Sequence, residues 1–143
     1  MDFSSMSNVV SISGLIITAL AFIFTVISFK RQLRLSFFSE YTKRYQEIII
    51  NLPSTINSKE FDFDHLDEEE KDKTLRYMRA YFDLCSEEYF LMKRGHIGEE
   101  TWQEWSAGME FSFSKVAFKK AWFLLREDTI YYGEFCQFVE QGM

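Results

Sequence analysis

The feature that most constrains this chain is the apolar stretch at residues 9–29, VVSISGLIITALAFIFTVISF, which contains no charged residue. As a helix that rises about 1.5 Å per residue it would be about 31 Å long, enough to cross a hydrocarbon core of about 30 Å. A cleaved signal peptide would begin with basic residues and end in small ones, whereas MDFSSMSN precedes this stretch and KRQLR follows it. Because the stretch is apolar on all sides, a soluble core helix is also disfavoured. The sequence therefore predicts a transmembrane helix.

The basic residues near this stretch predict its orientation. All of them follow it and none precedes it: Lys30, Arg31, Arg34, Lys43 and Arg44. Basic residues concentrate on the cytoplasmic side of a span. We therefore expect a single-pass protein of the cell inner membrane, with an extracytoplasmic stub at residues 1–8, a juxtamembrane helix at 30–51 and a cytoplasmic helical domain at 52–143.

Small and hydroxyl-bearing residues inside the span recur with a 3-4-3-4-3 spacing, which places them on one stripe of a helix: Ser11, Gly14, Thr18, Ala21, Thr25 and Ser28. Small residues let transmembrane backbones approach closely, and hydroxyls can hydrogen-bond across the contact. This stripe predicts a seam between copies of the chain. Chance alignment of common membrane residues and the lining of a pore are the alternatives.

The composition after the span favours one all-helical domain. About 110 residues remain of 143, with a single proline, which is enough for one core. The formal net charge of −6 disfavours binding to duplex nucleic acid, since that affinity comes mainly from neutralised phosphates. Cys85 and Cys136 are expected to be free thiols in a reducing compartment. His65 and His96 are far apart and outside any ligand spacing, so we expect no metal site and no cofactor.

Apolar periodicity predicts five helical segments. The span should continue through residues 30–51 until Pro53, and residues 75–93 should form a central helix that ends at Gly95. A third helix should open at Glu99 and Glu100, Ser114 should cap a fourth, and Asp128 or Thr129 should cap a fifth. The expected inward residues of these three helices are Trp102, Trp105, Met109 and Phe113, then Val116, Phe118, Ala121, Trp122 and Leu125, then Tyr132, Phe135, Cys136 and Val139.

Three polar features could carry function. Glu88 falls on the apolar face of the central helix, where a carboxylate must find hydrogen bonds or a cation, or else take up a proton. We expect a hydrogen-bonded structural glutamate, since no second catalytic group pairs with it unless His96 or a tyrosine does. The acidic stretch 60–72 is either a solvated entry turn with Phe61 and Phe63 on the core, or a docking strip. A basic patch is the candidate ligand-binding site, either for a phosphate-bearing ligand or as a merely solvated face: Lys115, Lys119, Lys120 and Arg126.

The segments YFDLCSEEYFLMKRGHIGEETWQEWSAGMEFSF, AWFLL and YYGEFCQFV resemble a group of small bacterial single-span membrane proteins with a helical cytoplasmic domain of unknown function. The shared positions are core and cap residues: Tyr89, Phe90, Gly95, Ile97, Trp102, Trp105 and Phe135. The resemblance implies architecture and carries no activity. In layout alone the chain is similar to membrane effectors of bacterial antiviral systems, including CRISPR-associated ones gated by cyclic oligoadenylate.

These observations predict a non-enzymatic, membrane-anchored module that forms homo-oligomers, with a cytoplasmic helical sensor domain for a protein partner or a signal. The alternative is an antiviral-defence effector that permeabilises the inner membrane when a nucleotide second messenger binds. No catalytic residues are predicted, and a tethered enzyme that uses Glu88 is the least favoured hypothesis.

Overall fold

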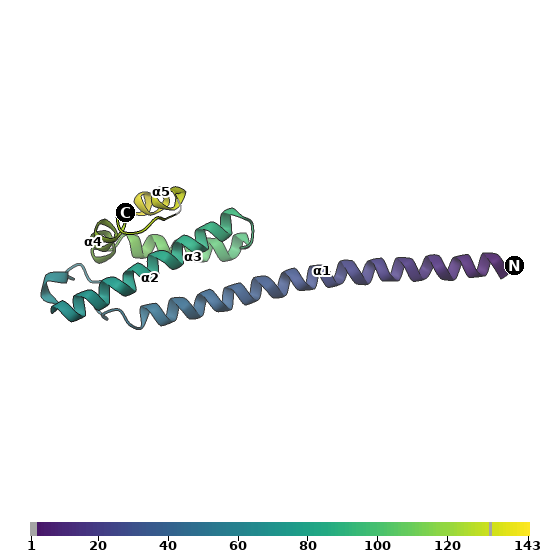
Figure 1. Cartoon of the computed structure of the whole chain (residues 1–143), viewed down its shortest axis with the longest axis horizontal. Coiled ribbons are helices and arrows are strands. Elements are labelled where there is room, and N and C mark those ends of the chain that lie inside the picture. Colours follow the sequence, from purple (N-terminus) through teal and green to yellow (C-terminus); the bar gives the residue numbers. More distant parts are fainter. Residues whose placement is uncertain (1–2, 132) are drawn as a thin grey trace. The chain divides into compact units, whose positions relative to one another are not determined.

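The computed structural model describes residues 3–131 and 133–143, and the side chains from residue 8 onward except that of residue 9. Its described part is helical and contains no strand, as predicted (Figure 1). The elements in chain order are α1 (Phe3–Ile49), the short 3-10 helix η1 (Phe63–His65), α2 (Glu68–Lys93), α3 (Glu99–Phe113), α4 (Val116–Leu125) and α5 (Gly133–Gly142).

Helix α1 carries both the apolar stretch and the basic residues that follow it. The expected continuation of the span into a second helical segment is confirmed, because α1 is one helix from Phe3 to Ile49. It ends two residues before the predicted position, where the Asn51 side chain donates to the Glu47 carbonyl oxygen at 2.8 Å. The chain nevertheless divides into two compact units, Met1–Ser36 and Phe37–Met143. The second unit therefore includes the last part of α1 as well as the four helices after it.

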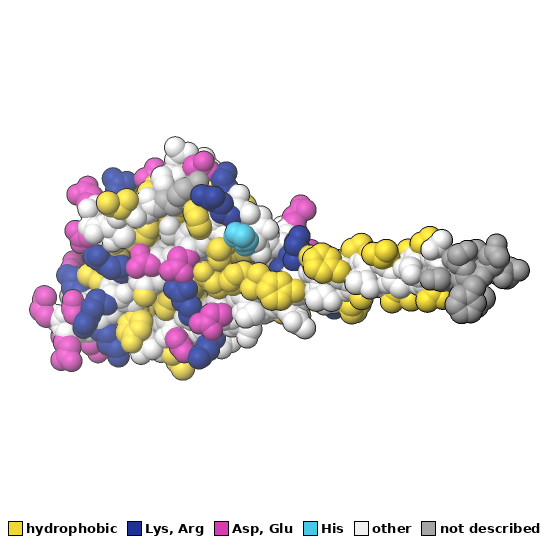
Figure 2. All heavy atoms as spheres, turned by 45° about the vertical axis from the view of Figure 1, so that its right-hand side comes forward, with side chains coloured by type: hydrophobic (Ala, Val, Ile, Leu, Met, Phe, Trp, Pro, Cys, Tyr) yellow, Lys and Arg dark blue, Asp and Glu magenta, His cyan; other side chains and the backbone are white. Residues whose placement is uncertain are grey.

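The first unit has the surface of a membrane-crossing helix. Residues Val10–Ile49 are long and apolar enough to cross a membrane, and large apolar side chains such as Leu15 and Phe24 are 71 % and 72 % exposed. Figure 2 shows apolar side chains along the described N-terminal part, whereas side chains of both charges cover the visible face of the helical domain. The core helix of a soluble protein would bury this surface, whereas none of the most apolar window of this helix is buried.

The segment between α1 and α2 folds onto the helical domain through its aromatic residues. Phe61 and Phe63 are buried and pack edge to face with ring centroids 5.1 Å apart. Asp67 caps α2, since its side chain accepts from the backbone N–H of Glu70 at 2.8 Å. Three glutamates then occupy the first turn, where negative charge is favourable against the helix dipole. The entry-turn interpretation of the acidic stretch is therefore confirmed.

Helix α2 is the central element of the second unit and contacts both α4 and α5. Its Phe82 ring lies between large rings from two other helices, with centroids 5.8 Å from Phe113 and 5.1 Å from Trp122. All three side chains are fully buried. The helix ends as predicted at Gly95, which has a φ of +71°; the His96 N–H donates to the Leu91 carbonyl oxygen at 2.9 Å. This left-handed cap is favourable for glycine.

Three details of the C-terminal helices differ from the sequence prediction. Ser114 ends α3 instead of capping α4, and its hydroxyl donates to the Phe111 carbonyl oxygen at 2.7 Å. Helix α5 begins at Gly133, so Asp128 and Thr129 do not cap it and contact Arg79 instead. Val116 is 39 % exposed although it was expected to point inward. The predicted inward residue Tyr132 lies outside the described residues. The other predicted core residues of α4, Phe118, Ala121, Trp122 and Leu125, are buried.

Candidate functional site

A cavity lies among α1, α2 and α3, entirely within the second unit. Its volume is about 280 Å3, and it is partly open to solvent. Helix α1 contributes Tyr41 and Tyr45, α2 contributes Tyr81 and Glu88, and α3 contributes Glu104 and Trp105. The lining therefore combines aromatic rings with carboxyl groups, and it contains no lysine, arginine or histidine from the described part of the chain.

The aromatic rings of the cavity are arranged in two pairs. The Tyr41 and Trp105 ring centroids are 5.6 Å apart, and those of Tyr45 and Tyr81 are 6.2 Å apart. Trp105 is further braced by Phe38, which stacks on it at 6.1 Å. Each pair joins α1 to another helix, so the same contacts that fix α1 on the domain also shape the cavity.

Glu88 is the carboxyl group at the buried side of this cavity. It is only 6 % exposed, and no hydrogen bond joins its carboxyl group to another described residue within the chain. Burial is the main cause that raises its pKa to about 8, and nearby Glu87 adds to the rise while Arg44 opposes it. The expected hydrogen bond from a tyrosine, tryptophan or arginine is thus not found among the described residues. Uptake of a proton, the other course predicted for this carboxyl, is the one its environment favours at neutral pH.

The neighbouring Glu87 accepts hydrogen bonds from a tyrosine and an arginine, which are the kinds of partner expected for Glu88. Arg44 Nη1 and Nη2 donate to its two carboxylate oxygens at 2.6 and 3.2 Å, and the Tyr41 hydroxyl donates at 3.2 Å. The hydrogen bond from Arg44 is the largest cause that lowers the pKa of Glu87. Arg44 also lies over the Tyr41 ring, 5.2 Å from its centroid. Two adjacent glutamates on α2 therefore have opposite environments: Glu87 is ionised and paired, whereas Glu88 is buried in the cavity wall.

The sequence indicated most of these residues but not the cavity. Tyr41 and Tyr45 follow the four-residue apolar repeat of α1, and Glu88 was predicted to be buried on α2. Which face of α1 meets which face of α3 depends on tertiary packing, and periodicity does not determine it. Glu104 was missed altogether, because a glutamate on a helix with an ordinary polar face carries no signal of its own.

The four side chains of the predicted basic patch each contact a different residue of the chain. Lys120 Nζ pairs with Asp62 Oδ1 at 3.1 Å, and Arg126 Nη1 pairs with Glu140 Oε1 at 3.0 Å. Lys119 donates to the backbone oxygen of Met143, and Lys115 Nζ lies over the Phe111 ring at 3.7 Å. Each cation is engaged within the chain, so the structure does not bring Lys115, Lys119, Lys120 and Arg126 together as an open anion pocket. A ligand-binding role for them stays a prediction.

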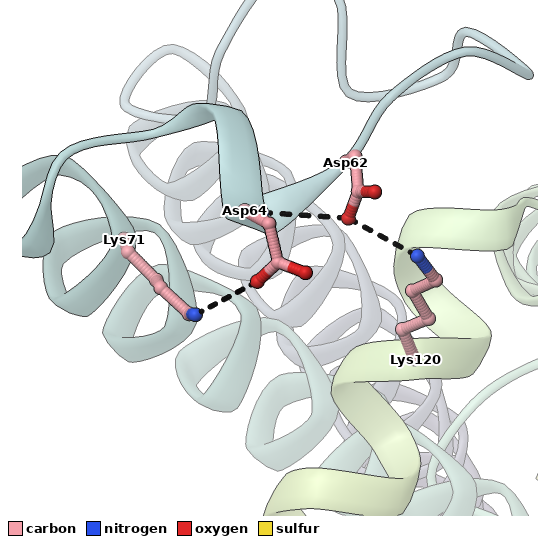
Figure 3. A network of polar contacts seen from close by, with 4 residues as sticks. All are labelled: Asp62, Asp64, Lys71 and Lys120. Carbon is pink, nitrogen blue, oxygen red and sulfur yellow. Dashed lines mark hydrogen bonds and ion pairs between the residues drawn. The ribbon is translucent and has the colours of Figure 1, made fainter.

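The partner of Lys120 belongs to a small polar network at the start of η1 (Figure 3). Asp62 Oδ1 also accepts from the backbone N–H of Asp64 at 3.4 Å, and Asp64 Oδ1 pairs with Lys71 Nζ at 3.3 Å. The hydrogen bond from Lys120 is the largest cause that lowers the pKa of Asp62. The network joins α4 to the acidic stretch, which gives Lys120 a structural role.

The small-residue stripe of the span is exposed along most of its length. The Thr18 hydroxyl donates to the Gly14 carbonyl oxygen at 2.9 Å, and the Thr25 hydroxyl donates to the Ala21 carbonyl oxygen at 2.8 Å. These bonds hold the hydroxyl hydrogens on their own helix. The oxygen atoms remain able to accept from a second helix, so the seam through Ser11, Gly14, Thr18, Ala21, Thr25 and Ser28 stays a prediction.

Cys85 is buried and Cys136 is half-buried, and both are free thiols. Burial raises the pKa of Cys85 well above its ordinary value, which keeps the thiol protonated at neutral pH. Among the described residues, no group of three or more His, Cys, Asp or Glu side chains is placed to hold a metal ion.

No protein-family model matches the chain, and neither the curated proteins nor the solved structures give a match. The resemblance noted for the core and cap residues therefore stays an expectation. The function is argued from the apolar helix and from the cavity beside Glu88.

Proposed function

We propose that this chain is a membrane-anchored helical module that works by binding, with the N-terminal part of α1 in the inner membrane and the second unit, which includes the end of α1, in the cytoplasm. The observation that carries the proposal is that α1 runs without a break from the apolar stretch to the cavity. Its N-terminal part has an apolar, exposed surface suited to lipid, and the same helix contributes Tyr41 and Tyr45 to the cavity. One continuous element thus links the proposed anchor to the proposed binding site.

The distribution of charge supports the orientation. Lys30, Arg31 and Arg34 follow the apolar stretch at once, and basic residues next to a span are retained in the cytoplasm. Cys85 and Cys136 are free, which suits a reducing compartment. We therefore place the helical domain on the cytoplasmic side and the N-terminus outside.

The groups that line the cavity support binding over catalysis. Burial raises the pKa of Tyr45 and that of Tyr81 above the ordinary value for tyrosine, so both remain phenols at neutral pH. Of the other described lining residues, only Glu104, which is exposed on α3, could act with Glu88 as an acid or base. A buried carboxyl group among aromatic rings suits recognition of a small ligand, and we expect the bound module to signal to a protein partner or to other copies of itself.

Alkaline carbonate extraction of membranes from cells that express the full chain tests the anchor. We expect the chain to stay in the membrane pellet, and a C-terminal fluorescent protein that matures only in the cytoplasm to be bright. The double variant Leu20→Arg with Phe24→Arg should move to the soluble fraction, because each charge at the middle of a span costs about 3 kcal/mol. The matched control, Leu20→Ile with Phe24→Leu, should stay in the pellet.

Two results would contradict the proposal. The first is release of the unaltered chain by carbonate, which would mean that α1 lies on a surface or packs in a soluble assembly. The second is a dark C-terminal fluorescent protein on a chain that resists extraction, which would place the helical domain outside.

A further inference from the structure

The lining of the cavity is complementary to a positively charged organic group. Four aromatic residues and two carboxyl groups line it: Tyr41, Tyr45, Tyr81, Trp105, Glu88 and Glu104. The faces of aromatic rings attract cations, and aromatic cages are the common means by which proteins hold ammonium groups. Among the described residues no basic side chain lines the cavity. Arg44, outside the lining, lies over the Tyr41 ring, which leaves the rings of Tyr45, Tyr81 and Trp105 for a cation from outside the chain.

Glu88 supplies the specific partner. Its side chain lies in the cavity wall, is 6 % exposed and accepts no hydrogen bond from another described residue. A buried carboxylate needs a counter-ion or hydrogen bonds, and without either it takes up a proton. A cation that entered the cavity would provide the counter-ion and would favour the ionised carboxylate.

Arg44 is near enough to influence Glu88 but does not neutralise it. Its guanidinium group is already held by Glu87, with Nη1 to Oε2 at 2.6 Å, and by the Tyr41 ring at 5.2 Å. The contact between Arg44 and Tyr41 also demonstrates that a ring of this wall accepts a cation. The place beside Glu88 therefore remains open to a charge from outside the chain.

The size of the cavity limits what it can hold. About 280 Å3 is just below the range of about 300–1,000 Å3 that is typical of small-molecule sites. This volume suits an ammonium head group of a few carbon atoms and is too small for an oligonucleotide.

We propose that the cavity binds the ammonium group of a small organic cation, held by the aromatic rings of Tyr41, Tyr45, Tyr81 and Trp105 and paired with the carboxylate of Glu88. The inference rests on the proposed function, for which it names the class of ligand. Free solutes such as choline and the head groups of lipids both fit this description, because both present the same ammonium chemistry.

Binding of this kind has a defined dependence on pH. The titratable and charged groups that face Glu88 are Arg44, Tyr41 and Tyr45 from α1, Tyr81, Cys85 and Glu87 from α2, and Glu104 from α3. The tyrosines and Cys85 have raised pKa values, so they stay protonated below pH 8, and the lowered pKa of Glu87 keeps it ionised. Glu88 must release its proton when the cation binds. Affinity should therefore rise about tenfold per pH unit between pH 6 and 7 and level off near pH 8.

Calorimetric titration of the full chain in a non-ionic detergent tests the inference. The probes are choline and 3,3-dimethylbutanol, which has the same shape without the charge. We expect choline to bind at least tenfold more tightly than the alcohol at pH 8, with release of a proton at pH 7. Equal binding of the two probes, or no binding of choline, would overturn the inference.

Three variants test which residues of the cavity bind the cation. In Glu88→Gln the affinity for choline at pH 8 should fall at least tenfold and its pH dependence should disappear. The matched control Glu100→Gln removes the same charge from an exposed position on α3 and should change the affinity less than threefold. Trp105→Leu, checked for folding by its melting temperature, should weaken choline more than the alcohol. Unchanged binding in Glu88→Gln would overturn the assignment.

A third probe distinguishes the sources of the cation. Tighter binding of dihexanoylphosphatidylcholine than of choline would assign a lipid head group, and tighter binding of choline would assign a free solute; either result supports the ammonium site. Carbonate extraction on the same cells separates this inference from the proposed anchor. A chain that stays in the membrane and binds none of the cations overturns the ammonium site alone.

Discussion

Burial governs the chemistry of Glu88. Water solvates an ionised carboxylate far better than an aromatic wall does, so desolvation raises the pKa of this group from its ordinary 4.5 to about 8. Arg44 lowers this pKa but acts from its pair with Glu87. The effect of burial on the pKa therefore outweighs the opposing charge of Arg44, and the carboxyl group of Glu88 is mostly protonated at pH 7.

This raised pKa predicts how stability depends on pH. Below about pH 4.5 the carboxyl group is protonated in the folded and the unfolded chain alike. Between that pH and about 8, the folded chain binds more protons, so its free energy of unfolding falls as pH rises, by at most about 1.4 kcal/mol per pH unit. The variant Glu88→Gln lacks this loss, so it should gain stability relative to the unaltered chain as pH rises.

Melting temperatures of both proteins at pH 5 and pH 8, followed by tryptophan fluorescence in a non-ionic detergent without added cations, measure this difference. Glu100→Gln serves as the control that removes an exposed carboxyl group. A difference between Glu88→Gln and the unaltered chain that is the same at both pH values would show that Glu88 is ionised throughout.

At the scale of the elements, apolar periodicity predicted the helices of the second unit well because each of them buries one face. The 3-4 spacing of α2 runs through Met78, Phe82 and Cys85, all of them buried. Helix ends were predicted less well. Ser114, Asp128 and Thr129 are good capping residues by type, but hydrogen bonds to Phe111 and Arg79 engage them elsewhere. A cap depends on local backbone geometry that residue type alone does not determine.

Helix α4 allows a matched test of the packing. Phe118 is 1 % exposed and Phe123 is 59 % exposed, so the same substitution on one helix samples the core and the surface. Phe118→Ala should lower the free energy of unfolding by about 3–5 kcal/mol, whereas Phe123→Ala should change it by less than about 1 kcal/mol. Denaturant unfolding of the full chain in detergent measures both. Losses of about 3–5 kcal/mol in both variants would mean that Phe123 is covered in the functional assembly. Losses of less than about 1 kcal/mol in both would contradict the packing of Phe118.

The cavity marks the limit of prediction from the sequence. Its residues come from three helices, and only the packing of α1 against α2 and α3 brings Tyr45, Glu88 and Trp105 to one place. The sequence indicated that Glu88 would be buried and in need of a partner. It did not indicate that Arg44 would pair with Glu87 instead, because two adjacent glutamates on a helix differ only in the direction in which each side chain points.

At the scale of the whole molecule, we propose that one chain combines a membrane anchor, self-association and ligand binding. Gly14 is the best position at which to test the predicted seam, because a Cβ atom added there meets no atom of its own chain within 4 Å. Gly14→Ile should therefore fit the single chain while it blocks the close approach of a second helix. Ile16→Phe, which adds bulk at an exposed position outside the stripe, is the matched control.

Native mass spectrometry of the full chain, released from a non-ionic detergent, tests the central claim most directly. The account predicts one defined oligomer for the unaltered chain and for Ile16→Phe, and a monomer for Gly14→Ile. An unaltered chain that remains a monomer at every concentration would contradict self-association through the span, and an oligomer that survives in Gly14→Ile would place the contact elsewhere.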